Sequence, residues 1–382
     1  MMRKIAAAAL AMLMTMGASF LMAQDGTKEP LKIGYGGAIL GNLASYGLSG
    51  LYGMEYAVLK ANAAGGVLGR KVEIVKEDDG CDPALASSAA TKLSGAGVKL
   101  VLGHTCSGAT ASALSVYGKN MLLISPSATE IGLTESGDNP YFFRTIMRDD
   151  AQADLQVEFV KKRGFKKVAI LHDKGDYGKA LADRAKAALD ADKSSGVKVV
   201  LFEGVTTGQV SYDAVVSKLK NSGADVLLWG GYYSDASKLV TQMRSKQVNT
   251  IVVGADGLKN EQFVKMAGQA ADGVFATGPA DLSQSADPPA TVTAALEDHK
   301  KRYPAEEIGP YFFYSAAAME ALFSAIEKAG GATDLEAIKK HLQEDTVETV
   351  MGPVRFDAKG DIIGSQAVMY EIKGGQFVEV DL

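Results

Sequence analysis

Residues 100–130 read LVLGHTCSGATASALSVYGKNMLLISPSATE and show the pattern on which the whole fold depends. An apolar run at 98–103 leads into a turn rich in Ser and Thr, then into a helix, and a second apolar run follows at 121–125. Two strands joined through a helix lie parallel, because the helix crosses one face of the sheet before the next strand begins. The segment therefore predicts a β–α–β unit of a parallel sheet.

The same alternation extends along most of the chain. Strand-like runs occur at 31–39, 71–78, 98–103, 121–125, 166–172, 197–205, 224–231, 249–254 and 272–277. Helical spacing is found at 50–61, 83–93, 150–162, 179–189, 212–220 and 235–244. Nine strands are many for one sheet. We therefore expect an α/β protein with two doubly wound parallel-sheet lobes.

The alternation is interrupted twice, at 137–150 and at 278–290. From there to His341 the chain is mostly helical, and strand-like runs return at 354–356 and 368–372. The periodicity does not show which lobe these last segments join.

The composition is that of a globular protein, with 47% hydrophobic and 22% charged residues. The 382 residues carry 40 basic and 45 acidic side chains, a formal net charge of -5. A nucleic-acid-binding protein needs clustered Lys and Arg to displace counterions, and the chain has no basic block. Two cysteines are too few for a four-thiolate zinc site. We expect no nucleic-acid partner, no metal and no cofactor.

The first residues have the pattern of a secretory signal peptide. Two basic residues precede the apolar run 5–21, and the polar stretch 24–28 follows it. We expect cleavage near Ala23, which removes residues 1–23 and delivers the protein to the periplasm. An uncleaved membrane anchor is the alternative, but the apolar run is shorter than the roughly 20 residues that a membrane-spanning helix needs.

Export affects the interpretation of the two cysteines. Cys81 and Cys106 each follow a strand-like run, and in an oxidising compartment the default is a disulfide. Closing a loop of about 26 residues would restrict the unfolded chain by about 3.5 kcal/mol. The alternative is a reactive Cys106 thiol beside His104, although no Cys–His–Asn arrangement follows in the sequence.

Catalytic signatures are missing. The sequence has no Gly-x-Ser-x-Gly elbow, no phosphate-binding lysine loop and no His-Glu-x-x-His pair, and its four histidines are scattered. Residues 77–79, Glu-Asp-Asp, are interpreted as the solvated end of a strand, since adjacent strand residues point to opposite faces. We therefore do not expect an enzyme.

The turns that follow the strands are better candidates for a site, because ligands of open parallel sheets bind beyond the carboxyl ends of the strands. Residues 106–110 and 125–129 each offer hydroxyls and free backbone N–H groups, which suit an anion such as a carboxylate. The alternative is that Ser107 and Thr129 are helix N-caps.

The second half of the chain offers the opposite chemistry. Tyr177, Tyr232 and Asp256 each follow a strand-like run, and a carboxylate beside tyrosine hydroxyls suits an ammonium group. The alternative for Asp256 is an N-cap or turn residue. Anion-suited turns in one half and cation-suited turns in the other predict a zwitterion held between the lobes.

Several segments carry a family resemblance: Asp78-Asp79-x-Cys81-Asp82-Pro83, Gly103-His104-x-Cys106-Ser107, His172-Asp173-Lys174-x-x-Tyr177-Gly178, Gly230-Gly231-Tyr232 and Val350-Met351-Gly352-Pro353. In this order and spacing the chain resembles the periplasmic leucine/isoleucine/valine-binding proteins of bacterial ABC importers. The resemblance implies a type I periplasmic binding fold with a three-stranded hinge and, as in that family, a disulfide between the two cysteines. The implied lobes are 30–147 plus 280–356 and 148–279 plus 357–382.

The resemblance also implies which residues contact the ligand. From the first lobe, the Ser107 hydroxyl would bind the ligand carboxylate, Ser127 would supply backbone contacts, and the Thr129 hydroxyl would reach the amino-acid head. Tyr46 would lie against the ligand side chain.

On the second lobe, Tyr232 and Asp256 would lie near the ammonium, and Tyr177 would line the pocket. The family carries a glutamate where this chain has Asp256. The shorter carboxylate could still pair with an ammonium, directly or through a water, or it could belong to a receptor for a different amino acid or amide. Thr105 would make the side-chain pocket slightly more polar.

We therefore expect a monomeric, extracytoplasmic solute-binding protein that captures leucine, isoleucine or valine between two closing lobes and delivers it to the permease of an ABC importer. The alternative is a receptor for another small molecule, such as another amino acid, an amide or an aromatic acid, in transport or sensing.

Overall fold

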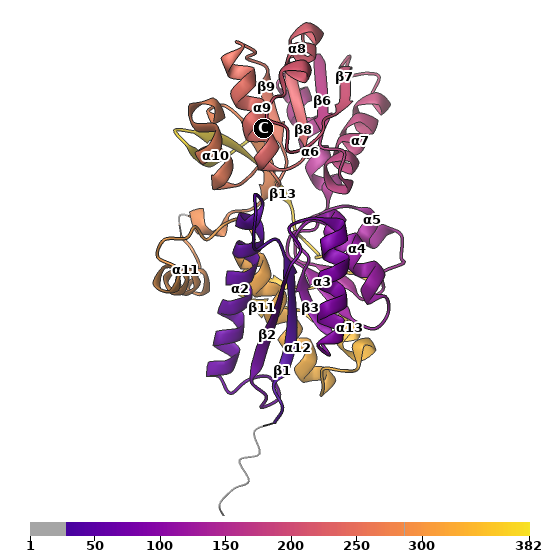
Figure 1. Ribbon diagram of the computed structural model, residues 1–382, viewed down its shortest axis with the longest axis vertical. Helices are drawn as coiled ribbons and strands as arrows, with labels where there is room; N and C mark the ends of the chain where they lie inside the picture. The colour runs from indigo at the N-terminus through magenta and orange to yellow at the C-terminus, as the bar shows by residue number, and fades with distance from the viewer. Residues whose placement is uncertain (1–27, 286) are drawn as a thin grey trace, which may run out of the picture.

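The computed structural model describes residues 28–285 and 287–382, and the predicted signal peptide lies outside them. Two lobes, each with its own sheet, lie end to end along the long axis (Figure 1). No helix within the described ranges has the length and apolar character that crossing a membrane requires.

The first lobe contains a five-stranded sheet in the order β2-β1-β3-β4-β5, with every pairing parallel. Its strands are β1 (Leu31–Gly37), β2 (Val72–Asp78), β3 (Leu100–Gly103), β4 (Leu122–Ser125) and β5 (Phe142–Arg144). A short antiparallel pair accompanies this lobe, β11 (Val347–Thr349) with β12 (Gly352–Val354).

The second lobe contains a seven-stranded sheet in the order β14-β13-β10-β9-β8-β6-β7. Its strands are β6 (Lys167–His172), β7 (Lys198–Gly204), β8 (Val226–Gly230), β9 (Ile251–Gly254), β10 (Phe275–Pro279), β13 (Ala367–Lys373) and β14 (Gln376–Val380). Pairings from β10 to β7 are parallel, and β13 is antiparallel to both of its neighbours. The predicted α/β fold with two doubly wound sheets is confirmed.

Helices connect the strands and cover both sheets. They are α2 (Ala44–Ala63), α3 (Pro83–Gly95), α4 (Ser107–Tyr117), α5 (Gly132–Glu135), α6 (Asp149–Lys162), α7 (Asp176–Ala191), α8 (Asp213–Ser222), α9 (Tyr233–Ser245), α10 (Glu261–Ala267), α11 (Ala290–Arg302), α12 (Phe312–Ala329) and α13 (Leu335–Glu344). Helix α3 illustrates how the sequence begins a helix: the Asp82 carboxylate accepts the Ala84 and Leu85 N–H groups at 2.8 and 2.9 Å, and Pro83 takes the first position.

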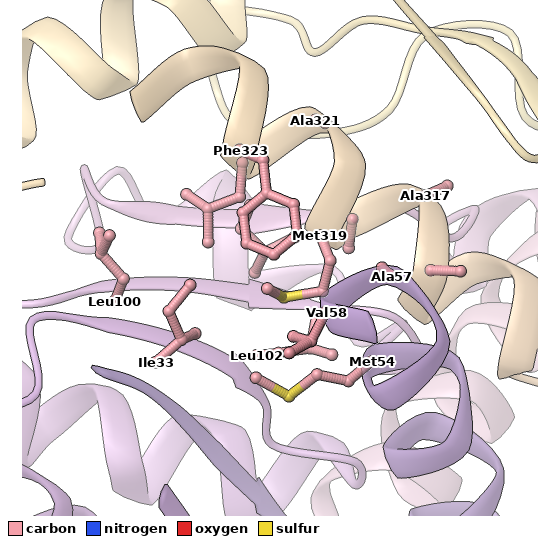
Figure 2. Packing of buried hydrophobic residues seen from close by; sticks show 14 of the residues in the cluster. Ile33, Met54, Ala57, Val58, Leu100, Leu102, Ala317, Met319, Ala321 and Phe323 are labelled. Carbon is pink, nitrogen blue, oxygen red and sulfur yellow. The ribbon is translucent and has the colours of Figure 1, made fainter. Parts of the chain in front are cut away.

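The first-lobe core follows from the two-residue period of its strands. On β3, Leu100 and Leu102 face the cluster that contains α2 and α12, whereas Val101 faces the cluster of α3 and α4. Figure 2 shows Met54 and Val58 of α2 close to Met319 of α12, with Phe323 of α12 and the strand residues Ile33 and Leu102 in the same cluster. Both faces of this sheet are therefore covered by helices.

Helix α12 approaches α2 closely. A side chain at Gly53 would place its Cβ 2.1 Å from the Phe312 carbonyl oxygen, so only glycine permits this contact. Residues 316–318 are three consecutive, fully buried alanines. Small residues thus allow a helix from late in the chain to complete the core of the first lobe.

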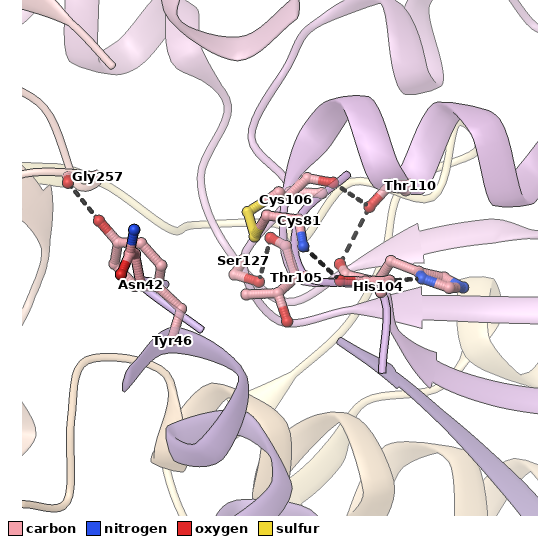
Figure 3. The surroundings of a disulfide bond; sticks show 12 residues. Asn42, Tyr46, Cys81, His104, Thr105, Cys106, Thr110, Ser127 and Gly257 are labelled. Atoms are coloured by element: carbon pink, nitrogen blue, oxygen red, sulfur yellow. Dashed lines mark hydrogen bonds and ion pairs between the residues drawn. A yellow bond between two sulfur atoms is a disulfide. The ribbon is translucent and has the colours of Figure 1, made fainter. Parts of the chain in front are cut away.

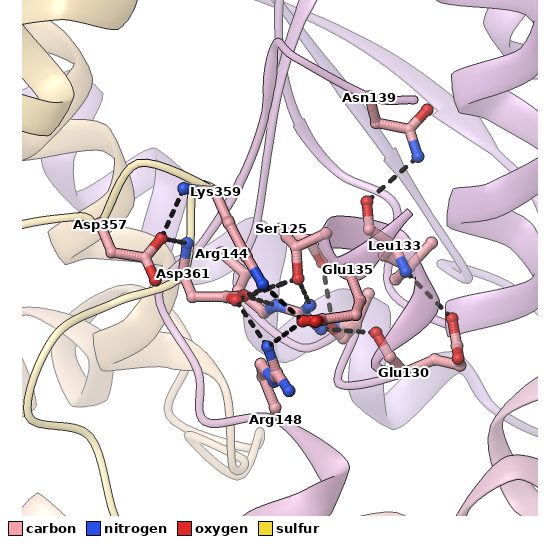
Figure 4. A network of polar contacts seen from close by, with 12 residues as sticks. Ser125, Glu130, Leu133, Glu135, Asn139, Arg144, Arg148, Asp357, Lys359 and Asp361 are labelled. Carbon is pink, nitrogen blue, oxygen red and sulfur yellow. Dashed lines mark hydrogen bonds and ion pairs between the residues drawn. The ribbon is translucent and has the colours of Figure 1, made fainter. Parts of the chain in front are cut away.

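Three segments pass between the two sheets: 145–148 after β5, one that includes 280–285 and 287–289 after β10, and 355–366 after β12. A polar network (Figure 4) joins the third segment to the end of β5, where the Arg144 Nε donates to Asp361 Oδ1 at 2.5 Å, and to the first segment. Arg148 reaches the same carboxylate at 3.3 Å. The predicted lobe boundaries near 147, 279 and 356 stay a prediction.

One local expectation is wrong. Residues 142–144 form a strand within the predicted break 137–150, and β5 pairs with β4 through Phe142 and Phe143. Three residues are too few to show a period of two in the sequence. The turn 125–129 is followed by the four-residue helix α5.

Candidate functional site

Residues that follow strands of both sheets meet in one cavity between the lobes. Its lining consists of Tyr46, Thr105, Cys106, Ser107, Ser127, Tyr177, Tyr232, Asp256 and Tyr311. Six of the seven ligand residues suggested by the sequence are thus brought together; only Thr129 is not on the lining. The open volume is about 10 Å³, roughly what one water needs.

The first-lobe side of the cavity is formed by the loops after β3 and β4. Ser107 is the first residue of α4, whose N-cap is Cys106, and the Ser107 Oγ accepts the Glu130 N–H at 3.3 Å. The Ser127 hydroxyl donates to the Thr105 carbonyl at 2.8 Å. The Thr129 hydroxyl is buried without a hydrogen-bond partner among the described residues. The N-cap interpretation of Ser107 and Thr129 is therefore wrong.

A disulfide between Cys81 and Cys106 holds the loop after β3 against the turn after β2 (Figure 3). The predicted disulfide is confirmed, and the alternative of a free Cys106 thiol is wrong. The Thr110 hydroxyl secures the same loop, because it lies 3.0 Å from the carbonyl oxygens of His104 and Cys106. The backbone of Ser107 is thus fixed by a covalent bond and by hydrogen bonds.

Asp79 corrects the interpretation of residues 77–79 as a solvated strand end. Its side chain is fully buried, and one carboxylate oxygen lies 2.6 Å from the His104 Nδ1. The other oxygen accepts the Cys81 N–H at 2.8 Å, and the His104 Nε2 lies 2.9 Å from the Tyr117 hydroxyl. A buried carboxylate requires such partners. The Asp79–His104 pair therefore links the turn after β2 to the loop after β3, the two segments that the disulfide also joins.

Asp256 occupies the second-lobe side of the cavity and is buried, with 3% of its surface exposed. Its Oδ1 accepts from the Gln152 amide at 2.7 Å and the Tyr177 hydroxyl at 2.8 Å, and its Oδ2 accepts from the Tyr311 hydroxyl at 2.9 Å. Burial raises the pKa of Asp256, and these three donors oppose that rise. Asp256 lies in a turn, as the alternative interpretation expects, but it does not cap a helix, because Asn260 caps α10.

Tyrosines form the walls between these two ends. The Tyr46 hydroxyl of the first lobe donates to the Gly257 carbonyl of the second (Figure 3). Tyr177 and Tyr232 stack with ring centroids 5.2 Å apart, and Tyr46 lies 5.8 Å from both Tyr232 and Tyr311. Burial raises the pKa of all four hydroxyls well above the ordinary tyrosine value, so they remain protonated donors.

Three residues of the site were not found from the sequence: Gln152 and Asp149 on the first turns of α6, and Tyr311 just before α12. Gln152 and Tyr311 lie on or before helices and not at strand ends, and Asp149 follows β5, a strand that the sequence pattern does not show. A usable signal exists in α6, where Asp149, Gln152 and Gln156 share the buried side with apolar residues. Polar side chains on the core face of a helix indicate either a site or a polar network.

The described residues contain no group of three His, Cys, Asp or Glu side chains placed to hold a metal ion. The side chains that line the cavity offer hydroxyls and one carboxylate, that of Asp256. This donor and acceptor set is suited to a small polar or zwitterionic molecule.

Known proteins resemble this chain over nearly its whole length. It is 35% identical over 356 residues to the leucine-, isoleucine-, valine-, threonine- and alanine-binding protein of Pseudomonas aeruginosa, covering 93% of this chain and 92% of that protein. It is 33% identical to the Leu/Ile/Val-binding protein of Escherichia coli, covering 90% and 91%.

Solved structures show the same fold. The branched-chain amino acid transporter substrate-binding protein of Streptococcus pneumoniae, in complex with isoleucine, is 29% identical with a TM-score of 0.80, covering 92% of this chain and all of that one. The leucine-binding protein of Thermotoga maritima superposes with a TM-score of 0.83 at 21% identity, covering 92% and 98%. The predicted type I periplasmic binding fold is confirmed. Residues 30–376 match the sequence profile of one family, described as periplasmic binding protein, and the chain belongs to that family.

Proposed function

We propose that the protein binds leucine, isoleucine or valine between its lobes and delivers it to the permease of an ABC importer. The main support for this proposal is the polarity of the cavity. Hydroxyls and the N–H groups of the α4 N-terminus lie at one end, and the Asp256 carboxylate lies at the other. An α-amino acid presents the matching pair, a carboxylate and an ammonium. The names of the relatives in Pseudomonas aeruginosa and Escherichia coli favour branched-chain ligands.

Ser107, Ser127 and Thr129 would hold the ligand carboxylate and head group. Tyr232 and Asp256 would lie near the ammonium, Tyr177 would line the pocket, and Tyr46 would lie against the ligand side chain. Charge-assisted hydrogen bonds contribute about 1.5–3 kcal/mol each, and burying a Leu-sized side chain contributes about 1.5–3 kcal/mol. After the ordering costs of binding, several such contacts are compatible with the roughly 8 kcal/mol of micromolar affinity.

Entry of the ligand requires the lobes to separate. The cavity lies between the lobes and has room for about one water, and the Tyr46 and Tyr311 contacts bridge the lobes. We propose that the segments near 147, 279 and 356 form the hinge, with lobes 30–147 plus 280–356 and 148–279 plus 357–382. Ligand would then select the closed form that the permease recognises.

The proposal includes an exported, periplasmic monomer whose signal peptide ends near Ala23, and no catalytic step. The resemblance keeps a second candidate open, because the branched-chain-binding proteins carry a glutamate at the position that corresponds to Asp256. The Pseudomonas relative is also named for threonine and alanine, so a receptor for a smaller or more polar amino acid remains the alternative.

Isothermal titration of unfolded and refolded protein tests the proposal, because refolding removes any ligand carried through purification. Leucine, isoleucine, valine, threonine, alanine, phenylalanine, acetamide and benzoate are compared. We expect micromolar or tighter binding of the three branched-chain amino acids. Stronger binding of threonine or alanine would favour the alternative. If a folded protein bound none of the amino acids, the proposed ligand class would be refuted.

Two variants assign the ammonium contact. Asp256→Asn removes the charge with little change in shape and is expected to weaken leucine binding at least tenfold. Asp154→Asn, on the exposed side of α6, removes the same charge outside the cavity and is expected to leave binding unchanged. Full affinity in Asp256→Asn would contradict the assigned role of this carboxylate.

A further inference from the structure

A second buried carboxyl group, Asp149, lies directly behind the Asp256 end of the cavity. Both side chains are buried. The Gln152 side-chain nitrogen donates to both, at 3.1 Å to Asp149 Oδ1 and at 2.7 Å to Asp256 Oδ1. Two carboxyl groups that share one amide nitrogen cannot both be ionised cheaply in a dry interior.

The two carboxyl groups accept different numbers of hydrogen bonds. Asp256 accepts three hydrogen bonds from side chains, whereas Asp149 accepts only the longer one from Gln152, and its Oδ2 is buried without a partner among the described residues. The Thr129 hydroxyl, also buried and unpartnered, is adjacent, since the Asp149 N–H donates to the Thr129 carbonyl at 3.0 Å. Three donors favour the ionised form at Asp256. Asp149 has fewer, and the adjacent Thr129 hydroxyl, as a donor, opposes the rise in the pKa of Asp149 without cancelling it.

The charged surroundings do not remove this asymmetry. The groups that face the pair are Arg144 of β5, Glu130 after β4, Tyr177 of α7, Tyr232 after β8 and Tyr311 before α12.

Arg144 and the N-terminus of α6 favour an ionised Asp149, but Arg144 already binds Asp361 at 2.5 Å. Burial, reinforced by the charge of Asp256, raises the pKa of Asp149 well above its ordinary value. The balance therefore favours one proton on the pair.

We propose that Asp149 is the second carboxyl group of the ammonium end, and that it holds a proton in the ligand-free protein and releases it when an amino-acid ammonium binds beside Asp256. This inference rests on the proposed function, because it requires a ligand that carries an ammonium. The proton leaves the Asp149 carboxyl group for solvent, and the ligand remains a zwitterion. The incoming positive charge is what stabilises the second negative charge.

The consequence is a linkage between affinity and pH. While Asp149 is protonated in the free protein and ionised in the complex, leucine affinity rises up to about tenfold for each unit of rising pH. Above the pKa of the free protein the dependence disappears. A site with a single ionised carboxylate would show neither effect near neutral pH.

The experiment is calorimetric titration with leucine at pH 6 in buffers of different ionisation enthalpy, whose slope gives the number of protons released. We expect release of up to one proton from the wild type and from Asp154→Asn, and none from Asp149→Asn. Leucine binding without proton release in the wild type, or equal release from Asp149→Asn, would overturn the inference while leaving the proposed function intact.

Infrared spectroscopy of the wild type provides a second measurement that does not depend on a stable variant. A buried protonated carboxyl group has a carbonyl stretching band distinct from that of a carboxylate. Asp173, whose pKa is raised to about 6, contributes to this band at pH 6, so the part that we assign to Asp149 is the part that is lost when leucine binds. A band that bound leucine leaves unchanged overturns the inference; presence of the band with no binding of any amino acid refutes the proposed function alone.

Discussion

Asp361→Ala is expected to destabilise the first lobe by leaving Arg144 without its charge partner. Arg144 is fully buried, and its Nε bond to Asp361 is 2.5 Å long. The Thr134 hydroxyl, 2.5 Å from the guanidinium, also donates to both Asp361 oxygens at 3.0 and 3.1 Å. The substitution thus disrupts a network and not a single contact (Figure 4).

The magnitude follows from what remains around Arg144. Breaking a buried ion pair costs about 3–5 kcal/mol, because the other charge stays buried. In the variant, the Arg144 guanidinium still donates to the carbonyl oxygens of Ala128 and Glu130, at 3.0 and 2.8 Å. These two acceptors place the expected loss near the lower end, about 3 kcal/mol. For a domain of this size that corresponds to a fall in Tm of roughly 6–12 °C.

Urea denaturation followed by two probes is the assay. Circular dichroism reports both lobes, whereas fluorescence of the single tryptophan, Trp229 on β8, reports the second. We expect Asp361→Ala to shift the dichroism transition more than the fluorescence transition, and Asp361→Asn to have a smaller effect. Glu135→Gln removes an exposed partner of Arg148 and serves as the control. An Asp361→Ala effect no larger than that of the control would refute the reasoning.

Three further predictions concern other parts of the molecule. Replacing both Cys81 and Cys106 with alanine is expected to lower the free energy of unfolding by about 3.5 kcal/mol, measured against the oxidised wild type; a loss below about 1 kcal/mol would contradict the closure of this loop as its cause. Tyr46→Phe removes the hydroxyl that binds the Gly257 carbonyl across the lobes, and a loss of about 1 kcal/mol should enlarge the radius of gyration in X-ray scattering; unchanged scattering would count against this contact. Burial raises the pKa of Asp173 to about 6, so the folded protein binds this proton more tightly than the unfolded chain, and the free energy of unfolding should fall by about 2 kcal/mol as the pH rises from about 4 to 6. Denaturation at several pH values should show this slope in the wild type and lose it in Asp173→Asn.

The regular elements were the predictable part of the structure. Buried parallel strands consist of continuous β-branched and aliphatic runs, so β1 to β4 and β6 to β10 all stand out in the sequence. Strand β5 does not, because three residues cannot display a period. Cys81 and Cys106 were paired correctly because export itself favours a disulfide.

The candidate site was predictable where it depends on strand ends. Ser107, Ser127, Tyr177, Tyr232 and Asp256 all follow strands, and parallel topology gathers such residues.

Tyr311 and Gln152 reach Asp256 from the starts of two helices, and their approach depends on how the lobes pack. The burial of Asp79 was not predictable for a related reason. Its partner His104 lies 25 residues away, and nothing local reveals a buried pair. Contacts made by tertiary packing leave no periodic signal in the sequence.

The position of α12 has a consequence for how the chain folds. This helix packs against α2 and on the sheet that contains β1, although some 280 residues separate Ile33 from Phe312, both in the same core. Contacts of such sequence separation form slowly, because the long loop must close first. The whole second sheet up to β10 is synthesised before the first lobe can be completed. An N-terminal fragment that ends near residue 145 therefore lacks the helix that covers one face of its sheet, and it should expose that apolar face until the later part of the chain arrives.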